Sequence, residues 1–284
     1  MLMDIKNMLW NQTWRWVDHS SSGLQFNPLQ SFALDDTFCA SVGEGASASI
    51  MRAWVHHPTI VLGIQDTRLP YAVEGIQYLE EEGYRVIVRN SGGLAVVLDE
   101  GIFNLSLIFK ENKKFSIHSG YDFMWELIRL MFPDAPGTID AYEVKGSYCP
   151  GDYDLSIGGK KFAGISQRRI RGGAAVQIYL AVTKSGAERA KVLQRFYQKA
   201  SKGEATRFTP PQIEPQVMSS LNELFGKTMS INDILYRLLT TFQKEGAMIK
   251  SSSLQPDEFT RFENFFDRVL ERNNKAIKKS TNQC

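Results

Sequence analysis

The sequence has only three cysteines in 284 residues, Cys39, Cys149 and Cys284. An odd and sparse set cannot form the disulfide framework of a small secreted protein, so each thiol is expected to be a buried filler or a reactive group. The longest apolar stretches reach about ten residues, well short of the roughly 18 that a membrane-spanning helix needs. The N-terminus also lacks the apolar core and the cleavage site of a secretory signal. We therefore expect a soluble, cytoplasmic protein.

The sequence also lacks an excess of charge of either sign. It has 33 lysines and arginines against 31 aspartates and glutamates, a formal net charge of +2. No whole-chain field therefore indicates a nucleic-acid or strongly acidic partner. With 43% hydrophobic residues, a chain of this length can bury a sizeable core without a disulfide or a metal ion.

Several well-known catalytic and cofactor motifs are missing too. There is no Walker A sequence, no Gly-x-Ser-x-Gly and no His-Glu-x-x-His. The segment 43–48 has the outline of a dinucleotide fingerprint, but a predicted helix precedes it and a strand follows, so we interpret it as a loop. His56 and His57 are adjacent on a predicted strand end and point to opposite faces, which argues against a metal site. We therefore expect neither a cofactor nor a metal.

Hydrophobic periodicity predicts alternating helices and strands up to about residue 182. Helices are expected over 31–39, 72–82 and 119–132. Strands are expected over 50–55, 59–62, 84–89, 95–98, 103–109, 154–157, 161–166 and 174–182. Strands that follow one another through tight turns, such as Gly158-Gly159, indicate a largely antiparallel sheet of the α+β class.

The last 70 residues or so have a different, helical pattern. Ser230 and Asp233 fit a capping box, and Pro256 opens a second helix with a stripe formed by Phe259, Phe262, Phe266 and others. We predict a main unit over 1–212 and a helical C-terminal extension over 213–284 that packs on the same domain.

Three segments remain as candidates for chemistry. The first is Arg89-Asn-Ser91-Gly92-Gly93, directly after a strand. Paired glycines allow a backbone to approach a ligand and offer amide donors. A plain hairpin turn explains the same residues equally well.

The second segment follows the Gly158-Gly159 turn and reads Lys160-Lys161-Phe-Ala-Gly164. Adjacent lysines in a strand point to opposite faces, so one of them can enter a pocket while the other stays solvated. On this pattern alone a solvated edge strand is the simpler interpretation.

The third segment places Cys149 between Tyr148 and Pro150, on a loop flanked by glycines. A reactive thiolate needs a nearby cation, and Lys161 lies one hairpin away. A lone loop cysteine is more often inert, so the pattern leaves both readings open.

In combination, these segments resemble the lipoate- and biotin-protein ligase superfamily over roughly residues 30–185. The Arg-x-Ser-Gly-Gly sequence from Arg89 and the Lys-x-x-Gly sequence from Lys161 to Gly164 carry the resemblance, together with Asn104. It implies a ligase-like (class II synthetase-like) mixed sheet with flanking helices, in which the Gly-Gly loop and the lysine line a tunnel for a lipoyl or octanoyl chain. The resemblance makes Lys161 the functional lysine and Lys160 its solvated neighbour. Val88 and Leu98 depart from the ATP-using ligases, which often carry Arg and His there.

The Tyr-Cys149-Pro-Gly-Asp-Tyr-Asp154 sequence is similar to the cysteine-dependent acyltransferases of that superfamily, as is the Gln-Arg-Arg sequence that ends at Arg169. This resemblance implies that Cys149 takes an octanoyl group from the lysine of the glycine-cleavage H protein as a thioester. The acyl group then passes to the lysine of the lipoyl domains of 2-oxoacid dehydrogenases. Lys161 would be the acid or the oxyanion partner, and Arg89, Ser91, Gly92, Gly93, Asn104 and Gly164 would bind the substrate. A cluster of Arg168, Arg169 and Arg171 would steer acidic carriers.

Three other activities fit the same residues. An octanoyltransferase that uses acyl carrier protein as donor would need the same cysteine and lysine. An ATP-dependent lipoate ligase would not need Cys149 at all. A carrier-binding protein with a degenerate pocket would never form an adduct.

Overall fold

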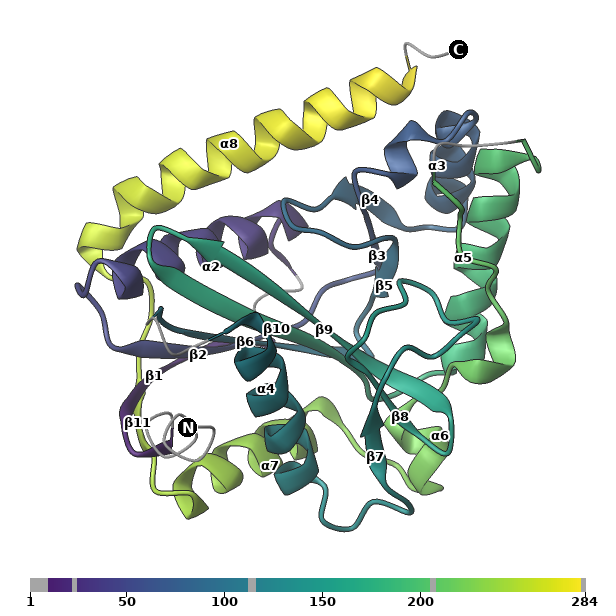
Figure 1. Cartoon of the computed structure of the whole chain (residues 1–284). Coiled ribbons are helices and arrows are strands. Elements are labelled where there is room, and N and C mark those ends of the chain that lie inside the picture. The colour runs from purple at the N-terminus through teal and green to yellow at the C-terminus, as the bar shows by residue number, and fades with distance from the viewer. Residues whose placement is uncertain (1–9, 22–24, 112–115, 205–207, 282–284) are drawn as a thin grey trace.

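The computed structural model describes residues 10–21, 25–111, 116–204 and 208–281, so Cys284 lies outside the described residues. Two sheets organise these residues (Figure 1). The large sheet has the strand order β11-β1-β2-β6-β10-β9-β8-β7, and the small sheet has the order β4-β3-β5. The α+β prediction with a mixed sheet and flanking helices is confirmed.

The centre of the large sheet is antiparallel, as the tight turns predict. β6 (Ile102–Lys110) pairs with β10 (Gly173–Ala181), β10 pairs with β9 (Lys160–Ile170), and β9 pairs with β8 (Asp154–Ile157). The antiparallel edge is β7 (Ile139–Ala141). At the other side, β2 (Ser49–Trp54) is antiparallel to β6, whereas β1 (Thr13–His19) is parallel to both β2 and β11 (Met248–Ser251). The parallel strands β1 and β11 were not predicted.

Helices cover both faces of the large sheet (Figure 1). α4 (Ile117–Met131) and α7 (Ile231–Lys244) pack on one face, where Phe103, Leu105 and Leu107 of β6 contribute to their core. α2 (Pro28–Gly43) packs on the opposite face, and α8 (Pro256–Thr281) runs along the outer side of α2. The helix expected over 31–39 is confirmed within α2. It is covered on both sides and buries nearly every residue from Pro28 to Val42, so Cys39 is a buried core thiol.

The small sheet contains β3 (Thr59–Leu62), β4 (Arg85–Val88) and β5 (Val96–Leu98). β3 is parallel to β4 and antiparallel to β5. The strands expected over 50–55 and 59–62 are both present, as β2 and β3, but they belong to different sheets. α3 (Ala72–Glu81) and α5 (Gly186–Ser201) pack on one another beside it, and α5 was not predicted. The functional site lies where the small sheet meets the α2 face of the large sheet.

The residues after 212 add elements to both faces of the large sheet. β11 adds an edge strand, α6 (Leu221–Phe225) and α7 contribute Leu221, Leu238 and Phe242 to the main core, and the capping box of α7 is present as predicted. In α8 the stripe is shifted, because Phe259 is 52% exposed and Phe265 is buried instead. Extensive contacts join the residues before and after 212, for example between α2 and α8. The boundary at residue 212 stays a prediction. In the described part of the chain, no helix is long and apolar enough to cross a membrane.

Candidate active site

A cavity of about 260 Å³ opens on the α2 face of the large sheet, against the small sheet. Seven of the eight residues predicted for the site line it, namely Cys149, Arg89, Ser91, Gly92, Gly93, Asn104 and Gly164. The apolar part of the wall was not predicted, since its residues come from separate strands and helices and form no local motif. It includes Phe32, Trp54, Val61, Leu98, Ile178 and Tyr179. Such a wall suits an alkyl chain, at about 0.8 kcal/mol for each methylene removed from water.

Cys149 occupies a constrained position at the cavity wall. Its backbone has φ 45°, in the left-handed region that a non-glycine residue rarely adopts. The backbone N–H of Leu94 donates a hydrogen bond to its Sγ at 3.2 Å. A hydrogen bond to the sulfur favours the thiolate, which is the nucleophilic form of cysteine. The loop geometry therefore holds a single thiol against the Gly92-Gly93 turn.

Lys161 does not line the cavity but lies directly behind the Cys149 loop. Its side chain is fully buried, and Nζ donates to the carbonyl oxygens of Tyr148 at 2.9 Å and Cys149 at 3.0 Å, with Ser147 Oγ at 3.2 Å. Its ion pair with Asp154 Oδ1 is 2.8 Å long. The ammonium group thus fixes the backbone on both sides of the strained residue.

The sequence prediction that only one of the two lysines enters the interior is confirmed. Lys160 is exposed and Lys161 is buried. A β-bulge between Leu155 and Ser156 shifts the register of β8 against β9 at this point. Bulges often redirect a side chain next to a site. At this bulge the usual alternation of buried and exposed residues is lost, because Lys161, Phe162 and Ala163 are all buried.

Asp154 is the counter-ion of Lys161, and it accepts further hydrogen bonds. The backbone N–H of Val144 and the hydroxyl of Ser147 both donate to its Oδ2. Burial raises the pKa of Asp154, while Lys161 and the hydrogen bond from Val144 act in the opposite direction. Ser147 and Asp154 lie in the sequence motif around Cys149, but their spacing alone gave no role to either of them.

The C-terminal segment braces the same loop from outside. The backbone N–H of Ser219 donates to the carbonyl of Lys161 at 2.8 Å, and that of Glu214 donates to the carbonyl of Gly146 at 2.7 Å. Met218 forms an isolated parallel bridge with Lys161. The chain beyond residue 212 therefore contributes to the geometry of the site.

The Gly92-Gly93 turn lies directly beside the Cys149 sulfur. Arg89 is buried, and its Nη1 donates to the carbonyl of Gly92 at 3.0 Å, so the guanidinium group holds the turn that follows it. Gly93 has φ +113°, and a Cβ there would lie 2.3 Å from Arg89 Nη1 and 3.3 Å from Cys149 Sγ. Gly164 is required for a second reason, because a Cβ there would lie 2.8 Å from the ring of Tyr179.

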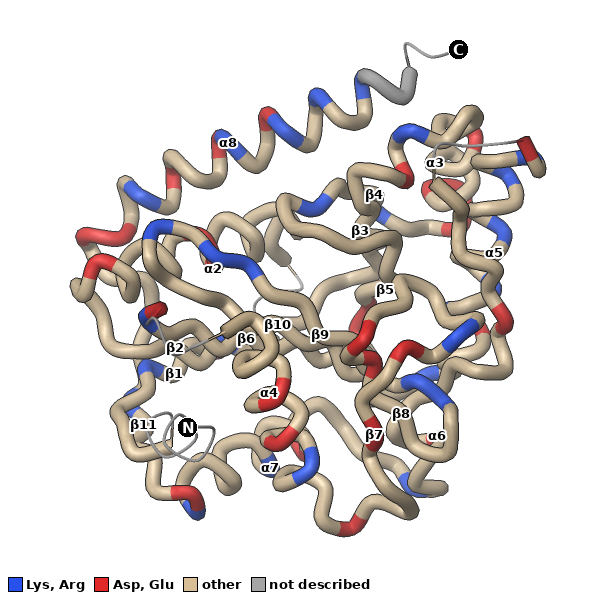
Figure 2. Tube along the Cα trace, in the orientation of Figure 1, with Lys and Arg blue, Asp and Glu red and all other residues tan. Residues whose placement is uncertain are grey.

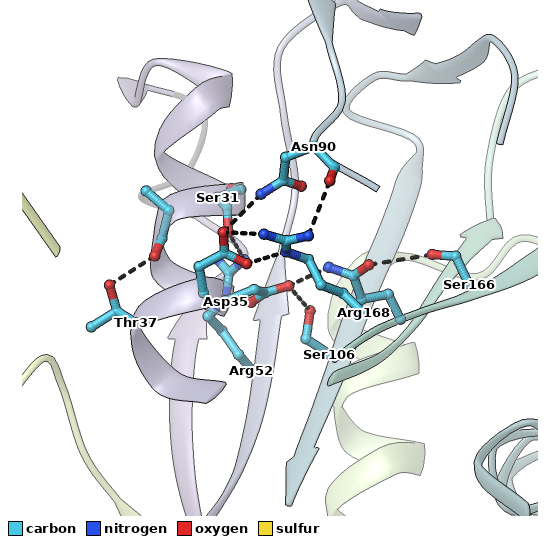
Figure 3. A network of polar contacts seen from close by, with 11 residues as sticks. Ser31, Asp35, Thr37, Arg52, Asn90, Ser106, Ser166 and Arg168 are labelled. Carbon is cyan, nitrogen blue, oxygen red and sulfur yellow. Dashed lines mark hydrogen bonds and ion pairs between the residues drawn. The ribbon is translucent and has the colours of Figure 1, made fainter. Parts of the chain in front are cut away.

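A buried polar network ties the cavity floor to α2 (Figure 3). Asp35 pairs with the fully buried Arg52 at 2.9 Å and accepts from Ser106 and from Gln177, a residue of the cavity wall. Next to it on the helix, Asp36 pairs with Arg168 and accepts from the Asn90 side chain at 3.0 Å.

The same network reaches the turn at the cavity. Arg168 also donates to the carbonyl of Asn90 at 3.0 Å, so α2 and β9 together hold the segment that leads into Gly92-Gly93 (Figure 3). Asn104 donates to the carbonyl of Trp54 at 3.2 Å and thereby joins two strands under the cavity.

Acidic side chains accompany all three arginines of the predicted steering cluster. Arg168 is bound to Asp36, Arg169 to Glu111 at 3.2 Å and Arg171 to Glu44 at 3.8 Å. Figure 2 shows lysines and arginines interspersed with acidic residues along the described chain. Glu44 also pairs with Arg261 at 2.7 Å, so it serves two arginines, and the steering role stays a prediction.

The two glycines of the turn give a matched pair for substitution. Gly93→Ala places a methyl group against Arg89 and Cys149 at a positive φ, and we expect it to lower the free energy of unfolding by about 2 kcal/mol. Gly92→Ala meets no atom within 4 Å, and its effect on stability should stay within about 0.5 kcal/mol. Urea unfolding followed by tryptophan fluorescence checks both values. Equal stability of the two variants would contradict the geometry described for the turn.

Comparison with known proteins places the chain in a family. Residues 27–243 match the family model of the lipoyl protein ligase A/B catalytic domain. An octanoyl-[GcvH]:protein N-octanoyltransferase from Bacillus velezensis is 55% identical over 274 residues, which cover 95% of this chain and 96% of that protein. The protein of the same description from Staphylococcus aureus is 50% identical over 277 residues, covering 97% and 99%.

Solved structures show the same fold at low sequence identity. A bi-partite lipoate protein ligase from Thermoplasma acidophilum aligns with a TM-score of 0.67 at 17% identity, over 91% of this chain and 92% of that chain. A lipoate-protein ligase A bound with ATP aligns with a TM-score of 0.65 at 17% identity, over 91% and 94%. The family match covers more than half of the sequence, and the near-full-length relatives are at least 50% identical. The chain therefore belongs to the lipoyl protein ligase A/B catalytic-domain family.

Proposed function

We propose that this protein transfers an octanoyl group from the lysine of the glycine-cleavage H protein to the lysine of lipoyl domains of 2-oxoacid dehydrogenases. The observation that carries the proposal is the position of the Cys149 thiol, which faces an apolar cavity and accepts a hydrogen bond from Leu94. The near-full-length relatives described as octanoyl-[GcvH]:protein N-octanoyltransferases support the choice of donor. A free, partly exposed thiol at the site suits a reducing cytoplasm.

The reaction proceeds in two exchanges at one sulfur. Cys149 Sγ attacks the carbonyl carbon of the octanoyl-lysine amide, the C–N bond breaks, and the thiol proton leaves on the amine of the donor lysine. The acceptor lysine amine then attacks the thioester carbon, the C–S bond breaks, and a proton returns to Cys149. One amide replaces another, so the exchange is near thermoneutral and needs neither ATP nor a metal.

Lys161 acts on this reaction through the loop that carries Cys149. Its donors are directed at the carbonyl oxygens of Tyr148 and Cys149, and it does not line the cavity. We therefore assign it the role of a positioning residue. Arg89, Ser91, Gly92, Gly93, Asn104 and Gly164 form the surface against which the acyl chain and its carbonyl group pack.

A transfer assay distinguishes the proposal from its rivals. Octanoyl-H protein and apo-lipoyl domain, mixed with the enzyme without ATP, should give octanoyl-lipoyl domain, and Cys149→Ala should abolish the product. Mass spectrometry of the lipoyl domain measures the transfer. Product formed only from octanoyl-acyl carrier protein would favour that donor instead. Product formed only from free lipoate and ATP, with Cys149→Ala fully active, would indicate a ligase.

Lys161→Met tests the positioning role. Removing one partner of a buried ion pair leaves Asp154 unpaired, so we expect a loss of about 3–5 kcal/mol in stability, together with loss of transfer. The exposed Lys160→Met serves as the control and should keep both properties.

A double variant separates stability from positioning. Lys161→Met with Asp154→Asn removes both charges and should recover part of the stability in urea unfolding, but it should not recover transfer. Wild-type transfer by the double variant would show that Lys161 contributes only to the fold.

A further inference from the structure

A buried carboxyl group outside the cavity is connected to the reactive sulfur through hydrogen bonds and the backbone link between Leu94 and Ala95. Asp66 lies in the 3-10 helix η2 (Asp66–Arg68) and is fully buried. Tyr197 of α5, itself 4% exposed, donates from its hydroxyl to Asp66 Oδ1 at 2.8 Å. Neither residue lines the cavity, and neither lies in a motif that the sequence singled out.

The chain of hydrogen bonds continues to the residue beside the sulfur donor. The backbone N–H of Ala95 donates to the Tyr197 hydroxyl oxygen at 3.3 Å. Its neighbour Leu94 donates its own backbone N–H to Cys149 Sγ at 3.2 Å. The N–H groups of Leu94 and Ala95 are successive along the backbone. The orientation of the Leu94 N–H therefore depends on where Tyr197 holds Ala95.

Asp66 also holds the other side of the same turn. The backbone N–H of Gly63 donates to Asp66 Oδ2 at 2.7 Å. A Cβ at Gly63 would lie 2.0 Å from the carbonyl oxygen of Gly93, so the two backbones are in direct contact. The Asp66 carboxylate thus fixes the end of β3 at Gly63, which contacts Gly93. Through Tyr197 it also fixes the start of β5, which follows Leu94.

We propose that Asp66 and Tyr197 are positioning residues for acyl transfer, which aim the backbone N–H of Leu94 at Cys149 Sγ. The proposal extends the proposed function above, since it assigns residues to the activation of the same thiol. A hydrogen bond that is directed at the sulfur before substrate arrives favours the thiolate without any rearrangement during the reaction.

The electrostatic environment agrees with this arrangement. Burial raises the pKa of Asp66 to about 6, while the hydrogen bonds from Gly63 and Tyr197 and the charge of Arg89 act against that rise. Above about pH 6 the group is therefore a carboxylate that can accept both hydrogen bonds. Burial and the neighbouring Asp66 raise the pKa of Tyr197 well above its usual value, so its hydroxyl stays protonated and donates. The other titratable or charged groups around Cys149 are Lys161, Asp154, Arg89, Tyr148 and Tyr179.

Tyr197→Phe tests the proposal, because it removes the hydroxyl and keeps the ring in the core. Alkylation of Cys149 by iodoacetamide is measured from pH 5 to 10 by peptide mass spectrometry, which separates this thiol from the other two. The pH midpoint of alkylation should rise by at least about 0.5 unit, which lowers the rate at pH 7 by about threefold. Octanoyl transfer should fall by a similar or larger factor. Asp66→Asn should move the midpoint in the same direction.

Two controls exclude a general loosening of the fold. Leu193→Ala removes a buried side chain of the same helix and should lower the melting temperature without moving the midpoint. Tyr71→Phe removes an exposed hydrogen bond to Glu204 and should change neither property. A folded Tyr197→Phe or Asp66→Asn protein with the wild-type alkylation profile would overturn the proposal, and so would a shift as large in Leu193→Ala. Alkylation needs no acyl donor, so these results remain interpretable even if the wild-type protein does not accept octanoyl-H protein.

Discussion

The ammonium group of Lys161 is the constraint on which the site depends. It is buried, pairs with Asp154 and donates to two successive carbonyl groups of the Cys149 loop. A lone buried charge is costly, but a charge surrounded by acceptors can hold a backbone in a conformation that its residues would not adopt alone. That conformation is the positive φ of Cys149, which presents the sulfur to the cavity. The residues after 212 hold Lys161 and Gly146 from outside and make this arrangement rigid.

The Gly92-Gly93 turn, which lies directly beside the sulfur, is held by hydrogen bonds to its carbonyl groups. Arg89 binds the carbonyl of Gly92, Arg168 binds that of Asn90, and α2 anchors Arg168 through Asp36. The glycine turn therefore has little freedom before a substrate binds. Preorganised donors of this kind contribute to catalysis because they need no reorganisation at the moment of reaction. The site thus consists of two restrained loops that meet at one sulfur atom.

Local patterns and the family resemblance singled out Cys149 and the Arg89–Gly93 segment, which line the cavity, and Lys161, which lies behind the Cys149 loop. Cys149, the Arg89–Gly93 segment and the choice of Lys161 over Lys160 follow from turn chemistry, strand alternation and family resemblance. The supporting residues could not be predicted in that way. Asp66 and Tyr197 are 131 positions apart and meet only through the packing of α5. The pairing of Arg168 with Asp36, and the covering of α2 by α8, also depend on long-range contacts that leave no periodic signal.

In the proposed reaction the acyl group passes through a covalent bond to one thiol. Intact-mass spectrometry of the enzyme, mixed with octanoyl-H protein in the absence of acceptor and ATP, tests this most directly. The result expected is one octanoyl group on the enzyme, mapped to Cys149 and lost when apo-lipoyl domain is added. Transfer to the lipoyl domain without any adduct, or an adduct on another residue that turns over at the full rate, would contradict the account.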